Sequence, residues 1–144
     1  MIATIAPCHT KINQPCHREK CETSAGYIPS FIAGFAEVDI VGTCDKLDDP
    51  AAPVWTKVHL RNVEAFGGGT LAYDPDTDQV LPHIHVAVGL KEQAAAGYTS
   101  HLLRAEVLFL TEMLVIEVTD PVMRRDRQPD LYDVPLLRFH RDTP

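Results

Sequence analysis

The segment from Leu81 to Leu90 constrains the fold of this chain most strongly, because its side chains alternate between two faces. His83 and His85 lie on one face of an extended strand, since residues two apart project the same way. The other face carries three branched aliphatic residues: Ile84, Val86 and Val88. Such alternation is typical of a strand that is buried on one side. The segment therefore predicts a sheet whose outer face carries two neighbouring imidazoles.

Other apolar segments also favour strands. Tyr27 to Val41 predicts a long strand in which Gly34 marks a bulge or a close backbone approach. Strands are also expected over three further segments: Val54 to Leu60, Val63 to Tyr73, and Val134 to Phe139, the last at a sheet edge. The run Gly67-Gly68-Gly69 indicates a kink or bulge rather than a phosphate-binding loop, because no Lys-Ser/Thr pair follows it. Periodicity alone leaves Leu102 to Val118 open between a helix and two strands.

The chain divides into a polar opening and one domain. Its 144 residues are enough for a single domain, which we place at residues 27–140. Residues 1–26 form a polar, cysteine-containing segment that predicts a helix ending near Gly26, with Pro15 in its first turn. The segment from Asp48 to Pro53 predicts a loop, because it contains two Asp and two Pro residues.

The net charge and the spacing of the cysteines limit which binding partners and which cellular compartment are expected. The net charge of −7 does not favour non-specific attraction to nucleic acid phosphates. No basic segment followed by a long apolar stretch opens the chain, and the most apolar segment is interrupted by charges, so neither a secretory signal nor a membrane span is expected. The four cysteines match no zinc-site spacing and are expected as separate thiols in a reducing cytoplasm: Cys8, Cys16, Cys21 and Cys44. Their role has no explanation in the sequence.

The histidine pair is the strongest chemical signal in the chain. Two imidazoles on one strand face can reach the same ion, and His101, after fifteen intervening residues, is placed for a neighbouring strand to return it to them. Three histidine ligands leave a fourth position open, as in catalytic or ligand-binding zinc sites. Two solvent-facing or hydrogen-bonded histidines are the alternative interpretation. The other four histidines have no such partners and are expected as surface residues or caps: His9, His17, His59 and His140.

Two rival metal motifs fit less well. Asp74, Asp76 and Asp78 resemble the start of an EF-hand loop, but Gln79 stands where glycine is required, so we interpret the segment as a turn. A cupin site also uses two histidines at this spacing, yet its glutamate follows more closely than Glu92 does here. A small basic cluster, Arg124 to Arg127, is diluted by acid and indicates a solvated loop.

Taken together, these motifs resemble the PPC (plants and prokaryotes conserved) domain, also called the AT-hook-associated domain. The resemblance runs from about Ile28 to Phe139 and rests on the order and spacing of several elements. These are Ile28 to Gly42, Val63-Glu64 leading into Gly69-Thr70-Leu71, Pro82-His83-Ile84-His85-Val86, Ser100-His101-Leu102, and Thr111 to Ile116. The tail from Arg125 to Phe139 is similar to the family's closing loop and strand.

The resemblance implies a fold, an assembly and a metal. It implies an α+β fold with a central, largely antiparallel β-sheet flanked by a few helices, assembled as a homotrimer, with Leu102 to Val118 as strands. It also implies that His83, His85 and His101 bind a metal, taken as Zn²⁺. The chain departs from the family at Ser100, where a glycine is usual, and it lacks the Arg-Gly-Arg-Pro hook with which plant relatives contact DNA. It is therefore similar to the prokaryotic members without an AT-hook.

Three functions follow as hypotheses. The first is a cytoplasmic, zinc-binding module, binding or regulatory, with a small-molecule ligand of unknown identity. The second is a DNA-associated regulator, by resemblance to relatives, which the acidic charge opposes. The third is an enzyme that uses a metal-activated water, with one of four acids as base: Glu64, Glu92, Glu106 or Glu112. We rank the binding module first and the enzyme last.

Overall fold

The structure is a computed structural model that describes residues 25–42, 56–131 and 133–141. Three features predicted from the sequence lie outside the described residues: the helix within residues 1–26 apart from its predicted end at Ala25 and Gly26, the loop over Asp48 to Pro53, and the four cysteines. The described part of the chain contains no helix that is long and apolar enough to cross a membrane.

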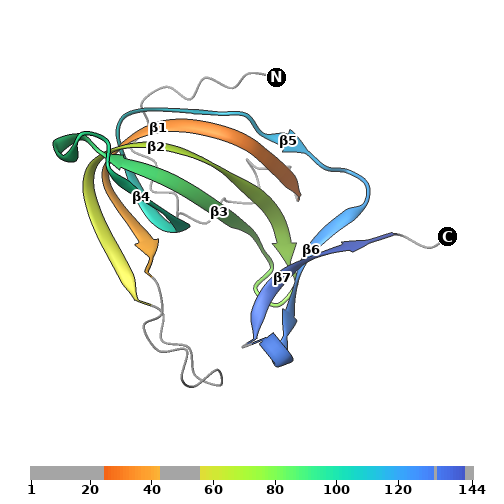
Figure 1. Cartoon of the computed structure of the whole chain (residues 1–144). Coiled ribbons are helices and arrows are strands. Elements are labelled where there is room, and N and C mark those ends of the chain that lie inside the picture. The colour runs from red at the N-terminus through yellow and green to blue at the C-terminus, as the bar shows by residue number, and fades with distance from the viewer. Residues whose placement is uncertain (1–24, 43–55, 132, 142–144) are drawn as a thin grey trace.

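Seven strands make up nearly all of the described chain (Figure 1). They are β1 (Gly26–Val41), β2 (Lys57–Asp74), β3 (Gln79–Leu90), β4 (Gly97–Met113), β5 (Ile116–Glu117), β6 (Val122–Gln128) and β7 (Val134–His140). Two short 3₁₀ turns connect them: η1 (Lys91–Gln93) between β3 and β4, and η2 (Pro129–Leu131) between β6 and β7.

The predicted α+β class is wrong for the described residues, which contain no α-helix. The expected flanking helices came from the resemblance, and the one segment of residues 27–140 whose periodicity also fitted a helix, Leu102 to Val118, forms strands. The strands leave little chain for them: Gln79 follows Asp74 after a four-residue turn, and six residues that include η1 separate β3 from β4. Helices of ordinary length need about 11 residues. The fold class is therefore all-β in the part that the structure describes.

The four long strands close into a ring. The sheet order is β5-β1-β4-β3-β2-β6-β7, and β1 pairs additionally with β2, so each of the four long strands, β1, β4, β3 and β2, has two neighbours within the ring. Figure 1 shows the long strands bending around one interior. All pairings are antiparallel except the single parallel bridge between Tyr73 of β2 and Arg124 of β6. The closure is partial, because β3 pairs with β4 only from His85 to Gly89, so the first half of β3 has a neighbour on one side only.

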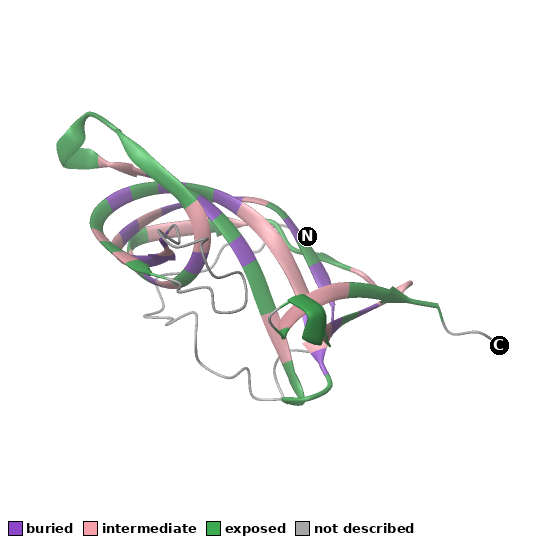
Figure 2. Cartoon of the chain, turned by 60° about the horizontal axis from the view of Figure 1, so that its bottom comes forward, coloured by how far each residue is buried: buried purple, intermediate pink, exposed green. Residues whose placement is uncertain are grey.

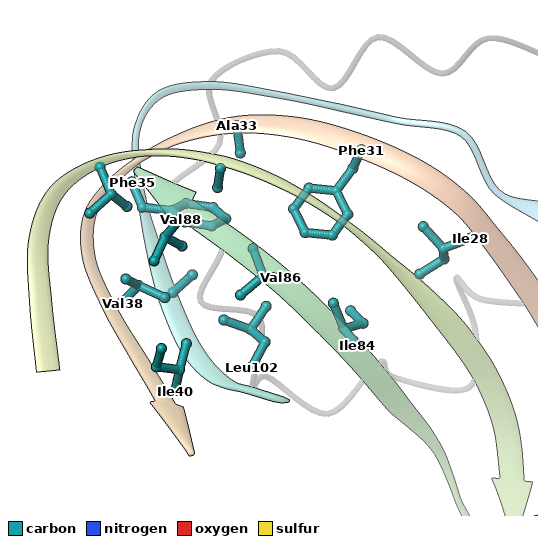
Figure 3. Packing of buried hydrophobic residues seen from close by; sticks show 13 residues of the cluster. Ile28, Phe31, Ala33, Phe35, Val38, Ile40, Ile84, Val86, Val88 and Leu102 are labelled. Carbon is teal, nitrogen blue, oxygen red and sulfur yellow. The ribbon is translucent and has the colours of Figure 1, made fainter. Parts of the chain in front are cut away.

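The ring encloses one apolar core (Figure 3). Burial alternates along the strands, as Figure 2 shows, with purple buried residues separated by exposed or half-buried ones. Phe35 fills the centre with the branched side chains Ile28, Val38, Val63 and Val86, each 1% exposed or less. The alternation predicted for Leu81 to Leu90 is confirmed, because Ile84, Val86 and Val88 are all buried. This inward face is what directs the histidines outward.

Two of the register irregularities of β1 lie at or opposite glycines. The register of β1 against β4 shifts at Gly34, opposite residues 108–110, which confirms the predicted bulge. The register of β1 against β2 shifts opposite Gly68, where Pro29 and Ser30 face one residue. A Cβ atom on Gly67 would lie 2.5 Å from the carbonyl oxygen of His85 and 2.6 Å from the ring of Phe31. The glycine run therefore permits close packing under β3, as the predicted kink requires.

The remaining predictions for strands are confirmed with shifted boundaries. Val63 to Tyr73 and the end of Val54 to Leu60 belong to one strand, β2, which pairs with β1 on both sides of Asn62. Asn62 adopts a positive φ of 59° that lets the strand continue past an irregular residue. Leu102 to Val118 forms β4 and β5 rather than a helix. Val134 to Phe139 lies in β7, at the edge of the sheet.

Candidate metal centre

Two adjacent strands bring three histidines together on the outer face of the sheet. His83 and His85 project from β3, and His101 projects from β4 directly opposite His85 in the strand register. Directly paired residues in antiparallel strands point to the same face. The hairpin through η1 therefore returns His101 to the pair, as the sequence spacing predicted.

The three rings form a compact cluster. Their centroids lie 5.3 Å apart for His83–His85, 4.7 Å for His83–His101 and 5.5 Å for His85–His101. One ring nitrogen from each histidine can be chosen so that all three lie within 4.8 Å of one another. Zinc–nitrogen bonds of about 2.0–2.1 Å place ligand atoms on one ion at most about 4.2 Å apart. Small ring rotations would bring these nitrogens to that separation, so the donor set fits a zinc-type ion.

Partial burial favours the metal-binding form of two of the imidazoles, His83 and His101. Partial burial lowers the pKa of His83 to about 4, assisted by the charges of His101, Arg125 and His85. The pKa of His101 is lowered for the same reason, with His85 and Arg125 contributing. A neutral imidazole has a free lone pair, whereas an imidazolium has none. At neutral pH His83 is therefore ready to coordinate an ion.

Arg125 adjoins the cluster from the C-terminal hairpin. Its side chain is buried, at 4% exposure, and one of its nitrogens donates to the Thr70 hydroxyl at 2.6 Å and to the Thr70 carbonyl at 3.4 Å. Thr70 is the strand partner of His83. Sequence reasoning missed this residue, because it interpreted Arg124 to Arg127 as a solvated loop. That interpretation was wrong for β6, where exposed Arg124 alternates with buried Arg125, whose side chain reaches Thr70 of β2.

The other candidate residues lie elsewhere. His59 pairs with Asp39 at 2.7 Å, and His140 pairs with Asp126 at 3.0 Å. These contacts make both histidines local partners of carboxylates. His9 and His17 lie outside the described residues.

The described residues bring no acidic side chain into the histidine cluster. Glu64 pairs with Lys91 at 2.8 Å, and Glu106 pairs with Arg104 at 3.6 Å. Glu92 is exposed in η1, and Glu112 lies opposite Ile32 in β1. None of the four is therefore placed by the structure as a base beside a metal at this site.

The Asp74–Asp78 segment is a turn. The Asp74 carboxylate accepts a hydrogen bond from the Asp76 backbone N–H at 2.9 Å, the geometry of an Asx turn. Asp76 also pairs with Arg127 at 3.2 Å. The interpretation as a turn rather than a calcium loop is confirmed.

The described residues form a closed, all-β sheet with a three-histidine cluster on its outer face. No protein-family model matches the chain, and no curated protein matches it. Solved structures do. A plant- and prokaryote-conserved (PPC) protein from Pyrococcus horikoshii is 16% identical, with a TM-score of 0.66, and the match covers 96% of this chain and 94% of that one.

Two further structures share this fold. A metal-containing protein from Archaeoglobus fulgidus is 18% identical over 96% of each chain, with a TM-score of 0.65. A "putative DNA-binding protein" from Ralstonia eutropha JMP134 is 18% identical, with a TM-score of 0.68, over 84% of this chain and 77% of that one. The chain therefore has the PPC fold, and the resemblance seen in the sequence is confirmed at the level of the fold.

Proposed function

We propose that this protein is a zinc-binding PPC-fold module that holds one ion with His83, His85 and His101 and presents it to a small-molecule ligand. One observation carries the proposal: three imidazoles from two strands converge with their ligand atoms within 4.8 Å. Partial burial lowers the pKa of His83 and of His101 and so favours the neutral form of these two. The metal-containing description of the A. fulgidus protein, which has the same fold, also supports it.

The donor set favours zinc among the common ions. Imidazole nitrogen suits zinc, copper, nickel and iron, and magnesium and calcium prefer oxygen. Three protein ligands leave a coordination position for an exogenous group. A binding or regulatory module uses such a position to hold a ligand. We do not extend the proposal to hydrolysis, because the cluster contains no carboxylate among the described residues.

The proposal includes a homotrimer in the cytoplasm. Exposed apolar side chains support self-association: Ile32 and Phe66 face each other across β1 and β2 at 53% and 59% exposure. Phe109 is 81% exposed and lies in the segment of β4 that bulges opposite Gly34. Gly34 follows Ile32 by two residues in β1, so Phe109 is near the pair. Large apolar groups gathered on one face are typical of protein interfaces. Separate cysteines at spacings that fit no metal site suit a reducing compartment.

DNA association is the second candidate, and one comparison favours it. The R. eutropha protein of the same fold carries a DNA-binding description. The net charge of −7 and the absence of an Arg-Gly-Arg-Pro hook in the sequence oppose direct contact. Mobility-shift measurements at low salt, where electrostatic contacts are strongest, test this candidate. Binding there would favour the regulator over the small-molecule module.

Elemental analysis of tag-free protein tests the metal. We expect about one zinc per chain, lost in the His83→Ala/His85→Ala double variant. His140→Ala is the matched control, because His140 lies on the edge strand β7 and pairs with Asp126. Retention of zinc by the double variant, or its absence from the unaltered protein after growth with zinc, would remove the site.

A further inference from the structure

Arg125 is a buried cation without a carboxylate partner. It is 4% exposed, and its hydrogen bonds in the described residues go to Thr70, a neutral residue. No acidic side chain of the described chain lies within ion-pair distance of it. Arg127, two residues later on the same strand, pairs with both Asp76 and Asp133. Burying a charge without a counter-ion is costly, so the contrast between the two arginines requires an explanation.

The position of Arg125 beside the histidine cluster explains why it is buried without a carboxylate partner. Thr70 and His83 are direct partners in β2 and β3, so their side chains share the outer face of the sheet. The guanidinium that donates to the Thr70 hydroxyl therefore lies beside the histidine cluster. Its charge acts on two of the three imidazoles, His83 and His101. β6 thus delivers a cation to the site from outside the ring of long strands.

Charge balance then points to an anion. With a divalent ion bound, the site would combine two positive charges with that of Arg125. Its three imidazole ligands are neutral, and the described residues add no acid to them. An anionic group at the open coordination position would offset the charge of the ion and that of Arg125. A neutral ligand would offset neither the ion nor the guanidinium.

We infer that Arg125 recognises the carboxylate of a small molecule held at the three-histidine site. This inference rests on the proposed metal binding and names the ligand class. A carboxylate has two oxygens, which suits one coordination position and one guanidinium. Phosphate groups are usually held by several donors, such as helix N-termini or backbone N–H cradles. The described residues contain no α-helix, so no helix N-terminus is among the groups that they bring to this site.

Cobalt substitution allows the ligand to be measured separately from the metal. The protein is loaded with Co²⁺, whose visible spectrum reports the coordination sphere, and is titrated with acetate, acetamide or inorganic phosphate. We expect a saturable spectral change with acetate and none with acetamide, which has the same shape without the charge. Phosphate is expected to bind more weakly than acetate. A cobalt spectrum that responds equally to acetate and acetamide, or more strongly to phosphate, overturns the inference.

Two arginine variants assign the effect to one side chain. Arg125→Gln should weaken acetate binding by about tenfold or more while Co²⁺ still binds, since a charge-assisted hydrogen bond is lost. Arg124→Gln is the matched control, because this neighbouring arginine is exposed on the opposite face of β6. Equal weakening by both variants would contradict the assignment. Failure of the unaltered protein to bind Co²⁺ would instead overturn the proposed metal site, and the carboxylate inference with it.

Discussion

The Thr70 hydroxyl accepts a hydrogen bond from the Arg125 guanidinium at 2.6 Å, and this bond ties the C-terminal hairpin to the strand that faces His83. The backbone makes only one residue pairing between β2 and β6, Tyr73 with Arg124. Side-chain contacts therefore contribute much of what holds β6 in place. The position of Arg125 at the site depends on this hydroxyl.

Thr70→Val tests that dependence. Valine keeps the shape of threonine but removes the acceptor, which leaves a buried guanidinium nitrogen with a weaker partner. We expect the free energy of unfolding to fall by about 1–3 kcal/mol in urea titrations. Thr99→Val, the same change at an exposed position in β4, should alter it by less than about 0.5 kcal/mol. Equal effects at the two positions would show that the Arg125 contact does not hold the hairpin.

The sequence predicts that the three histidines lie at the site, but it does not predict that Arg125 lies there. Alternation fixes His83 and His85 on one face, and that signal is local. The placement of His101 depends on the pairing register of β3 and β4, because a shift of one residue would turn its side chain away from His85. Arg125 is 55 positions from Thr70, and its neighbours in the sequence are both charged: Arg124 is exposed and Asp126 is half-buried. Only tertiary structure distinguishes it from Arg124.

The strands were predictable for the same physical reason, and the fold class was not. Each long strand buries alternate residues, so its existence follows from local pattern, as with Ile84 and Val86. Closure depends on β1 pairing with both β2 and β4, which no local pattern specifies. The bends at Gly34 and Gly68 that permit closure were visible as glycines, but the direction of bending was not.

Two glycines provide a matched pair for the packing under the site. Gly67→Ala would place a Cβ 2.5 Å from the His85 carbonyl oxygen and 2.6 Å from the Phe31 ring, so the core or β3 must move. We expect a loss of about 1–3 kcal/mol in the free energy of unfolding and weaker zinc binding. Gly34→Ala meets nothing within 4 Å and should be neutral or stabilising by up to about 1 kcal/mol. Calorimetry and zinc titration of both variants measure this, and a Gly67→Ala protein as stable as Gly34→Ala would refute the close packing.

Asp39 makes stability depend on acid pH. Its hydrogen bond with His59, at 2.7 Å, lowers its pKa below the usual 3.8, and Lys57 at 3.5 Å contributes, while burial acts in the opposite direction. Because the folded pKa lies below the unfolded one, this stabilisation is complete above about pH 3.8. It is lost as the pH falls through the lowered pKa.

Asp39→Asn should therefore destabilise the protein at neutral pH and not in acid. His59 and Lys57 are half-exposed or more, so we expect a loss of about 1 kcal/mol at pH 7. The difference from the unaltered protein should shrink below pH 4, measured by urea unfolding across pH. Asp130→Asn, at an exposed position in η2, serves as control. A difference that stays constant from pH 7 to pH 3 would contradict the role of the Asp39 carboxylate.

The proposed trimer predicts that the molecular mass in solution falls when one exposed apolar side chain is replaced by a charged one. Phe66 is 59% exposed and faces Ile32 across β1 and β2, so an aspartate there would bring a charge into an interface formed by this face. Sedimentation should give about 48 kDa for the unaltered protein, three times the 16.0 kDa chain, and a monomer for Phe66→Asp. Phe139→Asp, at an equally exposed phenylalanine on the edge strand β7, should leave the trimer intact. A monomeric unaltered protein would exclude the trimer, and a trimeric Phe66→Asp protein would place its interface on another face.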